Sequence, residues 1–450
     1  MSTKEKRTGG WLPTNPMHTN GWIHNLILKV EKNPRELIEP IRNFKAMVQA
    51  DLALNVSVYA MFQEALSRKK LSPTGEPEVR DFDHFLQLLN EIMVQAPEYI
   101  ECENKGIEDP CGLIGFPINA LLDWPMGTAS GYTVFSNTLV NQQFKTILRH
   151  WSKFLQTEAS RYVLVEGDPS ATPKVIPWLS ETALNEMVSV ACQGQDDPKA
   201  CQEKQFQDFF VCDPSDEYYG YKSWDDFFTR EFVAGVRPVA SPDDDDIIVN
   251  ACESGPLQVV ENVQETAQFW LKKQPYSLNN MLSWDSYAPQ FAGGTVYQAF
   301  LSALSYHRWH SPVAGTIKKA TIINGSYYLE NLYQGFKNPA GADDSAPNDS
   351  QAFLTAVATR AIIFIEADNP KIGLMCFMAI GMAEVSSCQV TVEVGQQVKK
   401  GEQLGMFHFG GSTHCLLFRP DVKLEFVEKA RNGSLDALNI PLKSEIARVL

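Results

Sequence analysis

The sequence has no apolar run long enough for a membrane-spanning helix. Its most apolar stretch, residues 372–383, is shorter than the roughly 20 residues that such a helix needs. The first twenty residues are polar and lack the apolar core of a secretory signal, so we expect no signal peptide. We therefore expect residues 372–383 to form buried strand and the protein to have no membrane partner.

Positive charge is also in short supply. The 39 Lys and Arg residues face 54 Asp and Glu residues, which gives a formal net charge of −15. This balance disfavours binding to nucleic acid or to anionic membrane surfaces, since both require clusters of basic side chains. With 44% hydrophobic and 21% charged residues, the composition is that of a globular protein, not a disordered chain.

The nine cysteines are odd in number, widely spaced and without a C-x-x-C pair. This pattern favours reduced thiols over a disulfide framework or a zinc site. It predicts a cytoplasmic protein and gives no reason to expect a metal.

The chain changes character near its middle. Apolar residues follow helical spacing in the first half, most clearly over residues 82–93 and 144–155, and less cleanly over 44–66. After Arg237-Pro238 the pattern becomes β-branched runs separated by glycine, at residues 247–249, 315–317, 361–365 and 390–394. The sequence thus predicts an α+β protein, with a helical N-terminal domain (1–235) and a β-rich, sandwich-like domain (236–450) that holds the candidate catalytic residues described next.

Three short clusters in the β-rich half carry groups capable of chemistry. His307 and His310 lie three residues apart in YHRWHSP, and without a third ligand nearby they suit acid–base work better than metal binding. Gly411-Ser412 follows Phe409-Gly410, which predicts either a turn or an exposed Gly411 carbonyl, but not a G-x-S-x-G elbow. Glu253, in ACESG, follows an apolar strand.

Taken together these clusters resemble the phosphatidylserine decarboxylase family. Three segments carry the resemblance in family order: WDDFFTRE (224–231), YHRWHSPVAGTI (306–317) and GEQLGMFHFGGST (401–413). An extra glycine before Ser412 and a glutamate in place of the family's aspartate resemble the soluble fungal branch, whose known member decarboxylates L-tryptophan. On that basis the resemblance extends over most of the chain.

The resemblance implies a pyruvoyl-dependent lyase that makes its own cofactor. Ser412 would attack the Gly411 carbonyl with His307 as general base and Glu253 orienting that histidine. Cleavage between Gly411 and Ser412 would leave a pyruvoyl group, derived from Ser412, on the chain of residues 412–450. The two chains would stay associated.

For a free aromatic amino acid, L-tryptophan above all, the products would be tryptamine and CO2. His310 would orient the substrate carboxylate or return a proton, and Trp309, Phe407 and Phe409 are candidate substrate-binding residues because they adjoin the motifs. Two alternatives stay open at this point. One is a phosphatidylserine decarboxylase making phosphatidylethanolamine. The other is a non-catalytic module, because the segment GQQVKKGEQLG (395–405) resembles hairpins of lipoyl or biotin carriers.

Overall fold

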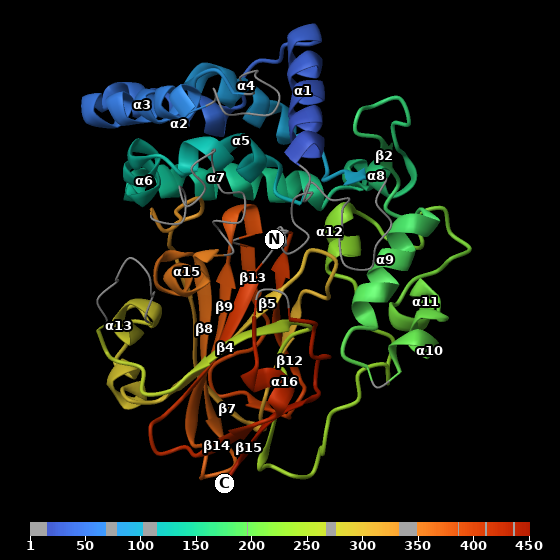
Figure 1. Cartoon of the computed structure of the whole chain (residues 1–450), viewed down its shortest axis with the longest axis vertical. Helices are drawn as coiled ribbons and strands as arrows, with labels where there is room; N and C mark the ends of the chain where they lie inside the picture. The colour runs from blue at the N-terminus through green and yellow to red at the C-terminus, as the bar shows by residue number, and fades with distance from the viewer. Residues whose placement is uncertain are drawn as a thin grey trace, which may run out of the picture. The chain divides into compact units, whose positions relative to one another are not determined.

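The chain folds into two compact units whose segments interleave along the sequence (Figure 1). The computed structural model describes residues 16–68, 79–101, 115–195, 197–266, 276–332, 349–385, 387–409, 412–434 and 437–450. The helical unit comprises Met1–Ala183, Asp216–Phe227 and Ser326–Ser350. The sheet unit comprises Leu184–Ser215, Phe228–Gly325 and Gln351–Leu450. The expected domain boundary between residues 235 and 236 stays a prediction.

The helical unit is built mainly from helices of two to five turns. These are α1 (Pro16–Lys32), α2 (Glu39–Ala50), α3 (Leu52–Arg68), α4 (Phe82–Ile92), α5 (Pro117–Met126), α6 (Ala129–Ser136), α7 (Thr138–Leu155) and α8 (Tyr162–Val165), with the 3-10 turn η2 (Glu158–Arg161) and the strand pair β1 (Tyr99–Ile100) and β2 (Val175–Ile176). Helices α9 (Glu181–Ala191) and α12 (Trp224–Phe228) run from one unit into the other. In the part of the chain that the structure describes, no helix is both long and apolar enough to cross a membrane.

Capping side chains explain where these helices begin. Asp81 accepts a hydrogen bond from the amide of His84 at the start of α4, and Asn137 caps α7 in the same way. Asp51 ends α2, and its carboxylate accepts the Leu54 amide at 3.0 Å, which starts α3. The helical N-terminal region that the sequence predicts is therefore confirmed, with Asp51 dividing the 44–66 segment into two helices.

Aromatic side chains from distant segments fill the core of the helical unit. The Phe144 ring lies 5.3 Å from Phe44 and 4.8 Å from Tyr328, measured between ring centroids. Phe44 also meets Phe82 edge to face at 5.4 Å. Tyr328 belongs to the 326–350 segment, so packing of this ring joins that segment to helices from the N-terminal third.

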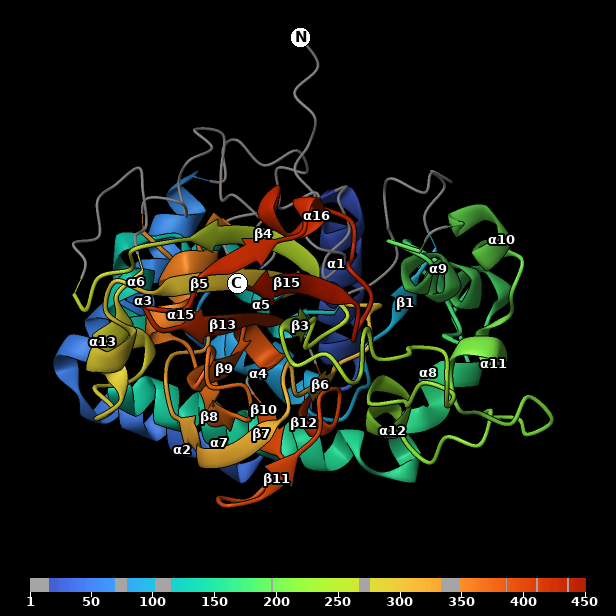
Figure 2. The same ribbon diagram turned by 90° about the horizontal axis from the view of Figure 1, so that it is seen from below.

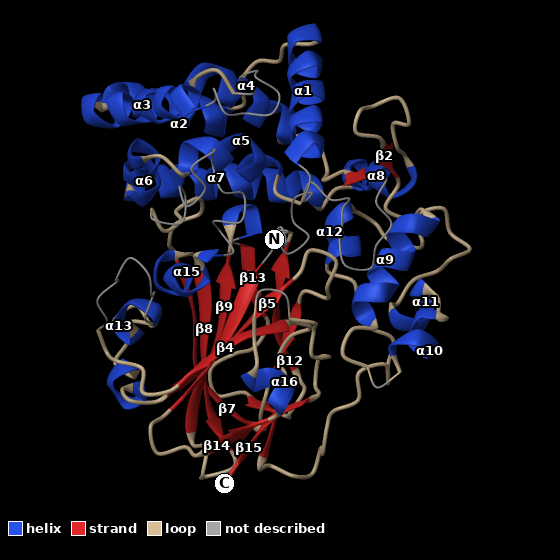
Figure 3. Ribbon diagram, viewed as in Figure 1, coloured by secondary structure: helices blue, strands red, loops and turns tan. Residues whose placement is uncertain are grey.

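The described residues of the sheet unit form three antiparallel sheets, whose strands are red in Figure 3. The largest has the order β11-β7-β8-β9-β13-β5-β4 and the two smaller ones the orders β10-β12-β6 and β14-β15-β3. The strands are β3 (Ile247–Val249), β4 (Gly255–Val260), β5 (Thr295–Leu301), β6 (Arg308–His310), β7 (Gly315–Ile323), β8 (Arg360–Ala367), β9 (Leu374–Gly381), β10 (Ser387–Val390), β11 (Gln397–Val398), β12 (Gln403–His408), β13 (Ser412–Phe418), β14 (Leu424–Phe426) and β15 (Glu445–Val449).

Both faces of the seven-stranded sheet are covered. On one face Phe364 of β8 packs against Phe291 of the 3-10 turn η3 (Ala288–Phe291). On the other face Phe377 of β9 packs against Trp309 of β6, which belongs to a second sheet. Short helices complete the unit: α10 (Pro198–Gln202), α11 (Phe206–Phe209), α13 (Leu278–Met281), α15 (Gln351–Val357), η4 (Ala383–Val385) and α16 (Glu428–Arg431). Sheet against sheet is the sandwich-like arrangement that we predicted, and Figure 2 shows β13, β5 and β4 side by side.

Of two predicted strands, the structure confirms one and shortens the other. The apolar stretch 372–383 forms β9, and all eight residues of this strand are buried, as expected. The run at 390–394 is strand only at Val390, because the following residues lead into a turn in which Gly395 has a φ of +88°.

The expectation of reduced thiols is wrong for one pair. Cys192 and Cys201 form a disulfide, with their Cα atoms 5.6 Å apart. The turn between α9 and α10 brings these two residues together, which sequence spacing alone does not reveal. The other cysteines that the structure describes (212, 252, 376, 388 and 415) are free thiols.

Candidate active site

The predicted cleavage site lies where the chain crosses from one sheet to another. Strand β12 belongs to the three-stranded sheet β10-β12-β6, and β13 lies inside the seven-stranded sheet. The backbone of Ser412 pairs with Leu301 on one side and Gly381 on the other. Gly410, Gly411 and the side chain of Ser412 lie outside the described residues. The described backbone therefore fixes both flanks of the junction.

His307 is buried beside the residues that precede the junction. Its backbone carbonyl accepts a hydrogen bond from the Phe407 amide at 3.0 Å. Its ring stacks on Phe228 with centroids 4.2 Å apart, and Phe228 in turn contacts Phe409 at 5.8 Å. Burial, together with the nearby Arg230 guanidinium, holds the pKa of His307 well below its usual range. The imidazole is therefore neutral, as a general base must be.

His310 occupies a different environment, although it lies only three residues away. It pairs with Gln403 at the start of β12, and its Nδ1 lies 2.9 Å from the Gly401 carbonyl oxygen. Its Nε2 lies 3.2 Å from the Tyr306 hydroxyl. Burial, and secondarily the Lys443 ammonium, lowers the pKa of His310 to about 3. The two histidines are thus both neutral, and His307 is the one whose neighbours flank the junction.

Glu253 is held by a buried arginine. Its carboxylate accepts two bonds from Arg237, at 2.6 and 3.0 Å, and a third from the Leu442 amide at 2.8 Å. Arg237 also donates to the Ala191 carbonyl at 2.7 Å. These bonds join Glu253 to Arg237 and Leu442, and an orienting role for Glu253 toward His307 stays a prediction. Removal of either charge would leave the other buried without a partner, which would lower the free energy of unfolding by about 3–5 kcal/mol.

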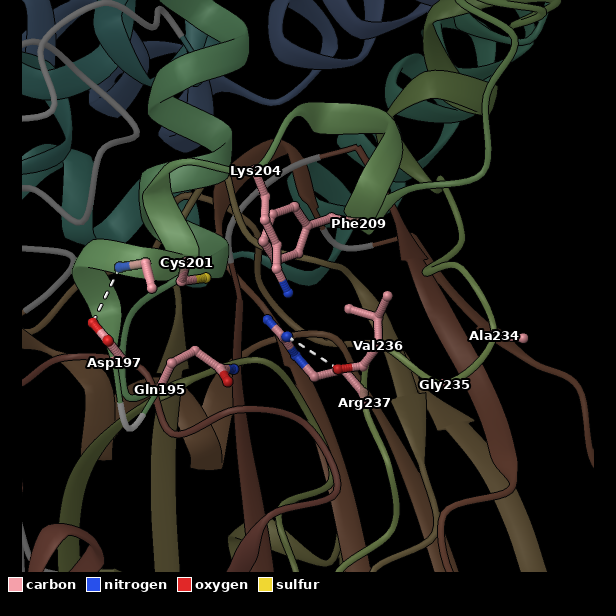
Figure 4. Close-up of a pocket in the computed structure, with 10 residues that line it drawn as sticks. Gln195, Asp197, Cys201, Lys204, Phe209, Ala234, Gly235, Val236 and Arg237 are labelled. Atoms are coloured by element: carbon pink, nitrogen blue, oxygen red, sulfur yellow. Dashed lines mark hydrogen bonds between the residues drawn. The ribbon is translucent and has the colours of Figure 1, made fainter.

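Arg237 also forms one wall of a pocket of about 540 Å³ in the sheet unit (Figure 4). Gln195, Asp197, Cys201 and Lys204 line it as well, and Figure 4 shows the Lys204 and Arg237 side chains pointing toward each other. None of the predicted site residues whose side chains the structure describes lines this pocket. In the sequence, Arg237-Pro238 marked only the change from helical to β-branched patterns, so no sequence signal pointed to this pocket.

The three predicted substrate-binding aromatics separate into two groups. Trp309 and Phe407 are fully buried, with ring centroids 5.0 Å apart, and Trp309 also packs on Phe377. These contacts are those of core residues between two sheets. Phe409 lies with Phe228 beside His307, and is the member of the three nearest the junction. A substrate-binding role for all three stays a prediction.

The described residues hold no group of three His, Cys, Asp or Glu side chains placed to bind a metal ion. The chemistry that the described side chains themselves offer is that of buried neutral imidazoles, a paired carboxylate and a strand-to-strand junction.

Comparison with known proteins identifies the class of decarboxylase. A family model described as phosphatidylserine decarboxylase matches residues 224–435, and a second phosphatidylserine decarboxylase model matches residues 38–187. Decarboxylase iboD of Amanita muscaria is 40% identical over 376 residues, covering 80% of this chain and 99% of that protein. The chain belongs to the phosphatidylserine decarboxylase family, as its motifs predict.

Two L-tryptophan decarboxylases are similar along almost their whole length. That of Psilocybe cubensis is 33% identical, over 94% of this chain and 91% of its own. That of Psilocybe cyanescens is 34% identical, over 96% of this chain and 92% of its own length. The similarity therefore includes the helical unit as well as the motifs of the sheet unit.

Proposed function

We propose that this protein is a pyruvoyl-dependent decarboxylase of free aromatic L-amino acids, converting L-tryptophan to tryptamine and CO2. The observation that carries the proposal is the sheet-to-sheet junction at Ser412, flanked by a buried neutral histidine. Near-full-length similarity to two L-tryptophan decarboxylases supports the choice of substrate. A net charge of −15 favours a small substrate in water over an anionic lipid surface.

Self-cleavage would use residues on both flanks of the junction. The Ser412 hydroxyl attacks the Gly411 carbonyl carbon, and His307 takes the hydroxyl proton. In the resulting ester, loss of the Cα proton of residue 412 expels the carboxylate of residues 1–411 from its Cβ, so that the larger chain ends in a carboxyl group. Water then displaces ammonia from the new N-terminus, which leaves residue 412 as a pyruvoyl group at the start of a 39-residue chain. The pyruvoyl group formed there supplies a ketone that binds the substrate amine and accepts the electrons left when CO2 departs.

The strand arrangement suits a cofactor made at residue 412. This residue would become a chain end at the first position of β13, an interior strand of the seven-stranded sheet. Backbone pairing to β5 and β9 holds that position after the bond before it is broken. Phe228, Phe409 and His307 are all buried, so the side chains that the structure describes next to the preceding strand β12 are shielded from water.

Cleavage is tested by intact mass. Purified protein should show two chains divided between Gly411 and Ser412, and Ser412→Ala should show one uncleaved chain without activity. Normal processing in Ser412→Ala would exclude Ser412 as the nucleophile. A single chain in the wild type would favour the non-catalytic carrier-like alternative instead.

The substrate is tested by a direct comparison. CO2 release should be measured with each free L-amino acid and with phosphatidylserine micelles, without added pyridoxal phosphate. We expect L-tryptophan to be turned over fastest and the activity to fall when borohydride is added together with substrate. Faster turnover of a non-aromatic amino acid would leave the reaction class in place and change the substrate. Faster turnover of the phospholipid would establish the alternative, a phosphatidylserine decarboxylase.

A further inference from the structure

A buried polar network lies beside the proposed cleavage site, on the face of the seven-stranded sheet that η3 covers. Its centre is Gln298 of β5, which is fully buried. The Gln298 amide nitrogen donates to the Thr413 hydroxyl at 3.0 Å and to the Gln351 carbonyl at 3.3 Å. The Gln298 amide oxygen accepts the hydroxyl of Tyr276. Both donors and the acceptor of this side chain are therefore in use.

Thr413 is fixed from two sides. Its hydroxyl accepts the bond from Gln298 and donates to the Ala299 carbonyl oxygen at 2.9 Å. In the β13–β5 ladder Thr413 pairs with Phe300, so Gln298 reaches it diagonally across the two strands. Thr413 follows Ser412 directly, and its side chain is the first of β13 that the structure describes.

The network continues away from the junction through Tyr276. The amide of Gln258, on β4, donates to the Tyr276 hydroxyl at 2.7 Å. The pKa of Tyr276 is raised well above its ordinary value by burial, so its hydroxyl keeps the proton that it donates to Gln298. The hydrogen bonds thus run from β4, through Tyr276 and β5, to the second residue of β13.

Stability alone gives a weak reason for such a network in a sheet core. Replacing a satisfied buried hydrogen-bonded pair with apolar groups of the same shape can be nearly neutral in free energy. What hydrogen bonds add is direction, because they hold atoms at a defined distance and angle. Self-cleavage needs that property, since a misplacement of about 1 Å in a reacting group can cost on the order of 100-fold in rate.

We propose that Gln298 is a positioning residue for self-cleavage: its bond to Thr413 fixes the start of β13, and with it the backbone of Ser412. This inference rests on the proposed function. Gln298 acts through Thr413 and does not itself take part in the bond-breaking step.

The test compares cleavage rate with stability in matched variants. Cleavage is followed on denaturing gels after cell-free synthesis, and stability by urea unfolding of the same variants carrying Ser412→Ala, so that every chain is intact. Gln298→Met and Thr413→Val each remove the side-chain bond between Gln298 and Thr413 and leave the backbone pairing of β5 with β13 in place. We expect each to slow cleavage at least tenfold. The double variant should be no slower than the slower single one, because each single change already removes the shared Gln298–Thr413 bond.

Tyr276→Phe is the matched control. It removes two other bonds of the same network, from Tyr276 to Gln298 and from Gln258 to Tyr276, so its urea midpoint should fall. Its cleavage should stay within about twofold of wild type because the Gln298–Thr413 bond remains. Thr413→Ser keeps the hydroxyl and should cleave normally. If Gln298→Met fails to fold, the cleavage rates of Thr413→Val and Thr413→Ser are compared instead.

Two results would overturn the inference while leaving the proposed function in place. One is cleavage of Gln298→Met and Thr413→Val at the wild-type rate. The other is a cleavage rate that falls in proportion to the urea midpoint in every variant, including Tyr276→Phe, because cleavage would then depend only on overall stability. A wild-type chain that never cleaves would overturn the proposed function, and the role of Gln298 in cleavage with it.

Discussion

At the scale of single residues, burial decides what the histidines of the sheet unit can do. His307, His310 and His414 are all buried, and in each case burial is the main cause of a lowered pKa. The H-x-x-H motif identified two of these residues from the sequence, but it could not separate their roles. Their separation depends on Phe228 and Gly401, which lie far away in sequence and next to them in space.

Replacing each of the two motif histidines should give a different phenotype. We expect His307→Ala to block cleavage, because its neighbours flank the junction, and His310→Ala to cleave at least partly but decarboxylate poorly. Denaturing gels and CO2 release measured on both variants test this. Swapped phenotypes would assign the base to His310, whose partner Tyr306 is within electrostatic range of Glu253.

His414 should make stability depend on pH. Both of its ring nitrogens lack a hydrogen-bond partner among the described residues, and burial lowers its pKa to about 3. Above an unfolded-state pKa of about 6.5 the imidazole is neutral in both states. Below it only the unfolded chain takes up the proton, so the free energy of unfolding falls by about 1.4 kcal/mol per pH unit until pH is near 3.

The experiment compares His414→Leu with the parent, both carrying Ser412→Ala, by urea unfolding at pH 6.5 and pH 5. The parent should lose about 2 kcal/mol more than the variant over this interval. His150→Gln, at an exposed position of α7, is the control and should follow the parent. Equal losses in the parent and in His414→Leu would show that His414 is charged in the folded state.

At the scale of helices and strands, most of the secondary structure could be predicted from local patterns. Helical spacing over 82–93 became α4, and the apolar run at 372–383 became β9, because each pattern reports burial of a single element. Partners across the sheets could not be predicted. The seven-stranded order places β13 between β9 and β5, and nothing in the spacing of apolar residues specifies these neighbours.

Close packing of β12 gives a prediction at this scale. A Cβ atom on Gly405 would lie 2.2 Å from the Gln389 carbonyl oxygen of β10 and 2.6 Å from the Trp309 ring of β6. Gly405→Ala should therefore push β12 off its two partners, lower the free energy of unfolding by about 1–3 kcal/mol and slow cleavage by moving Phe407 and the residues after it.

Urea midpoints and cleavage gels measure both effects. Gly395→Ala provides the control, because a Cβ there meets no atom within 4 Å. Its positive φ of +88° should cost about 1 kcal/mol without changing cleavage. If Gly405→Ala were as stable as the wild type, the close approach of β12 to Gln389 and Trp309 would be contradicted.

At the scale of the whole molecule, the sequence identified the family from local motifs. The three motifs kept their family order, and each was recognisable from contiguous residues. Membership of a unit depends instead on contacts between remote segments, such as Tyr328 packing on Phe144 within the helical unit. The disulfide and the Arg237–Glu253 pair were missed for the same reason, since each is made by a turn or a contact that local patterns do not encode.

The mature enzyme should behave as one particle made of two chains. After cleavage the 39-residue chain would still contribute β13, paired on both sides with strands of the larger chain, and β15, paired with β3. Its residues Cys415, Leu416, Leu417 and Phe418 are buried, so release would expose apolar surface as well as the edges of β5, β9 and β3. The disulfide joins two residues of the larger chain, and Cys415, the sole cysteine of the smaller chain, is free.

We therefore expect the two chains to co-elute on gel filtration at neutral pH, and to separate on a denaturing gel with or without reductant. Ser412→Ala should elute at the same volume as a single chain, which controls for a change of shape on cleavage. Dialysis of the mature protein should not deplete the smaller chain, and urea should release it at the concentration that unfolds the sheet unit, because β13 cannot leave without opening the seven-stranded sheet. Release of the 39-residue chain from an otherwise folded protein would contradict the pairing of β13 with β5 and β9.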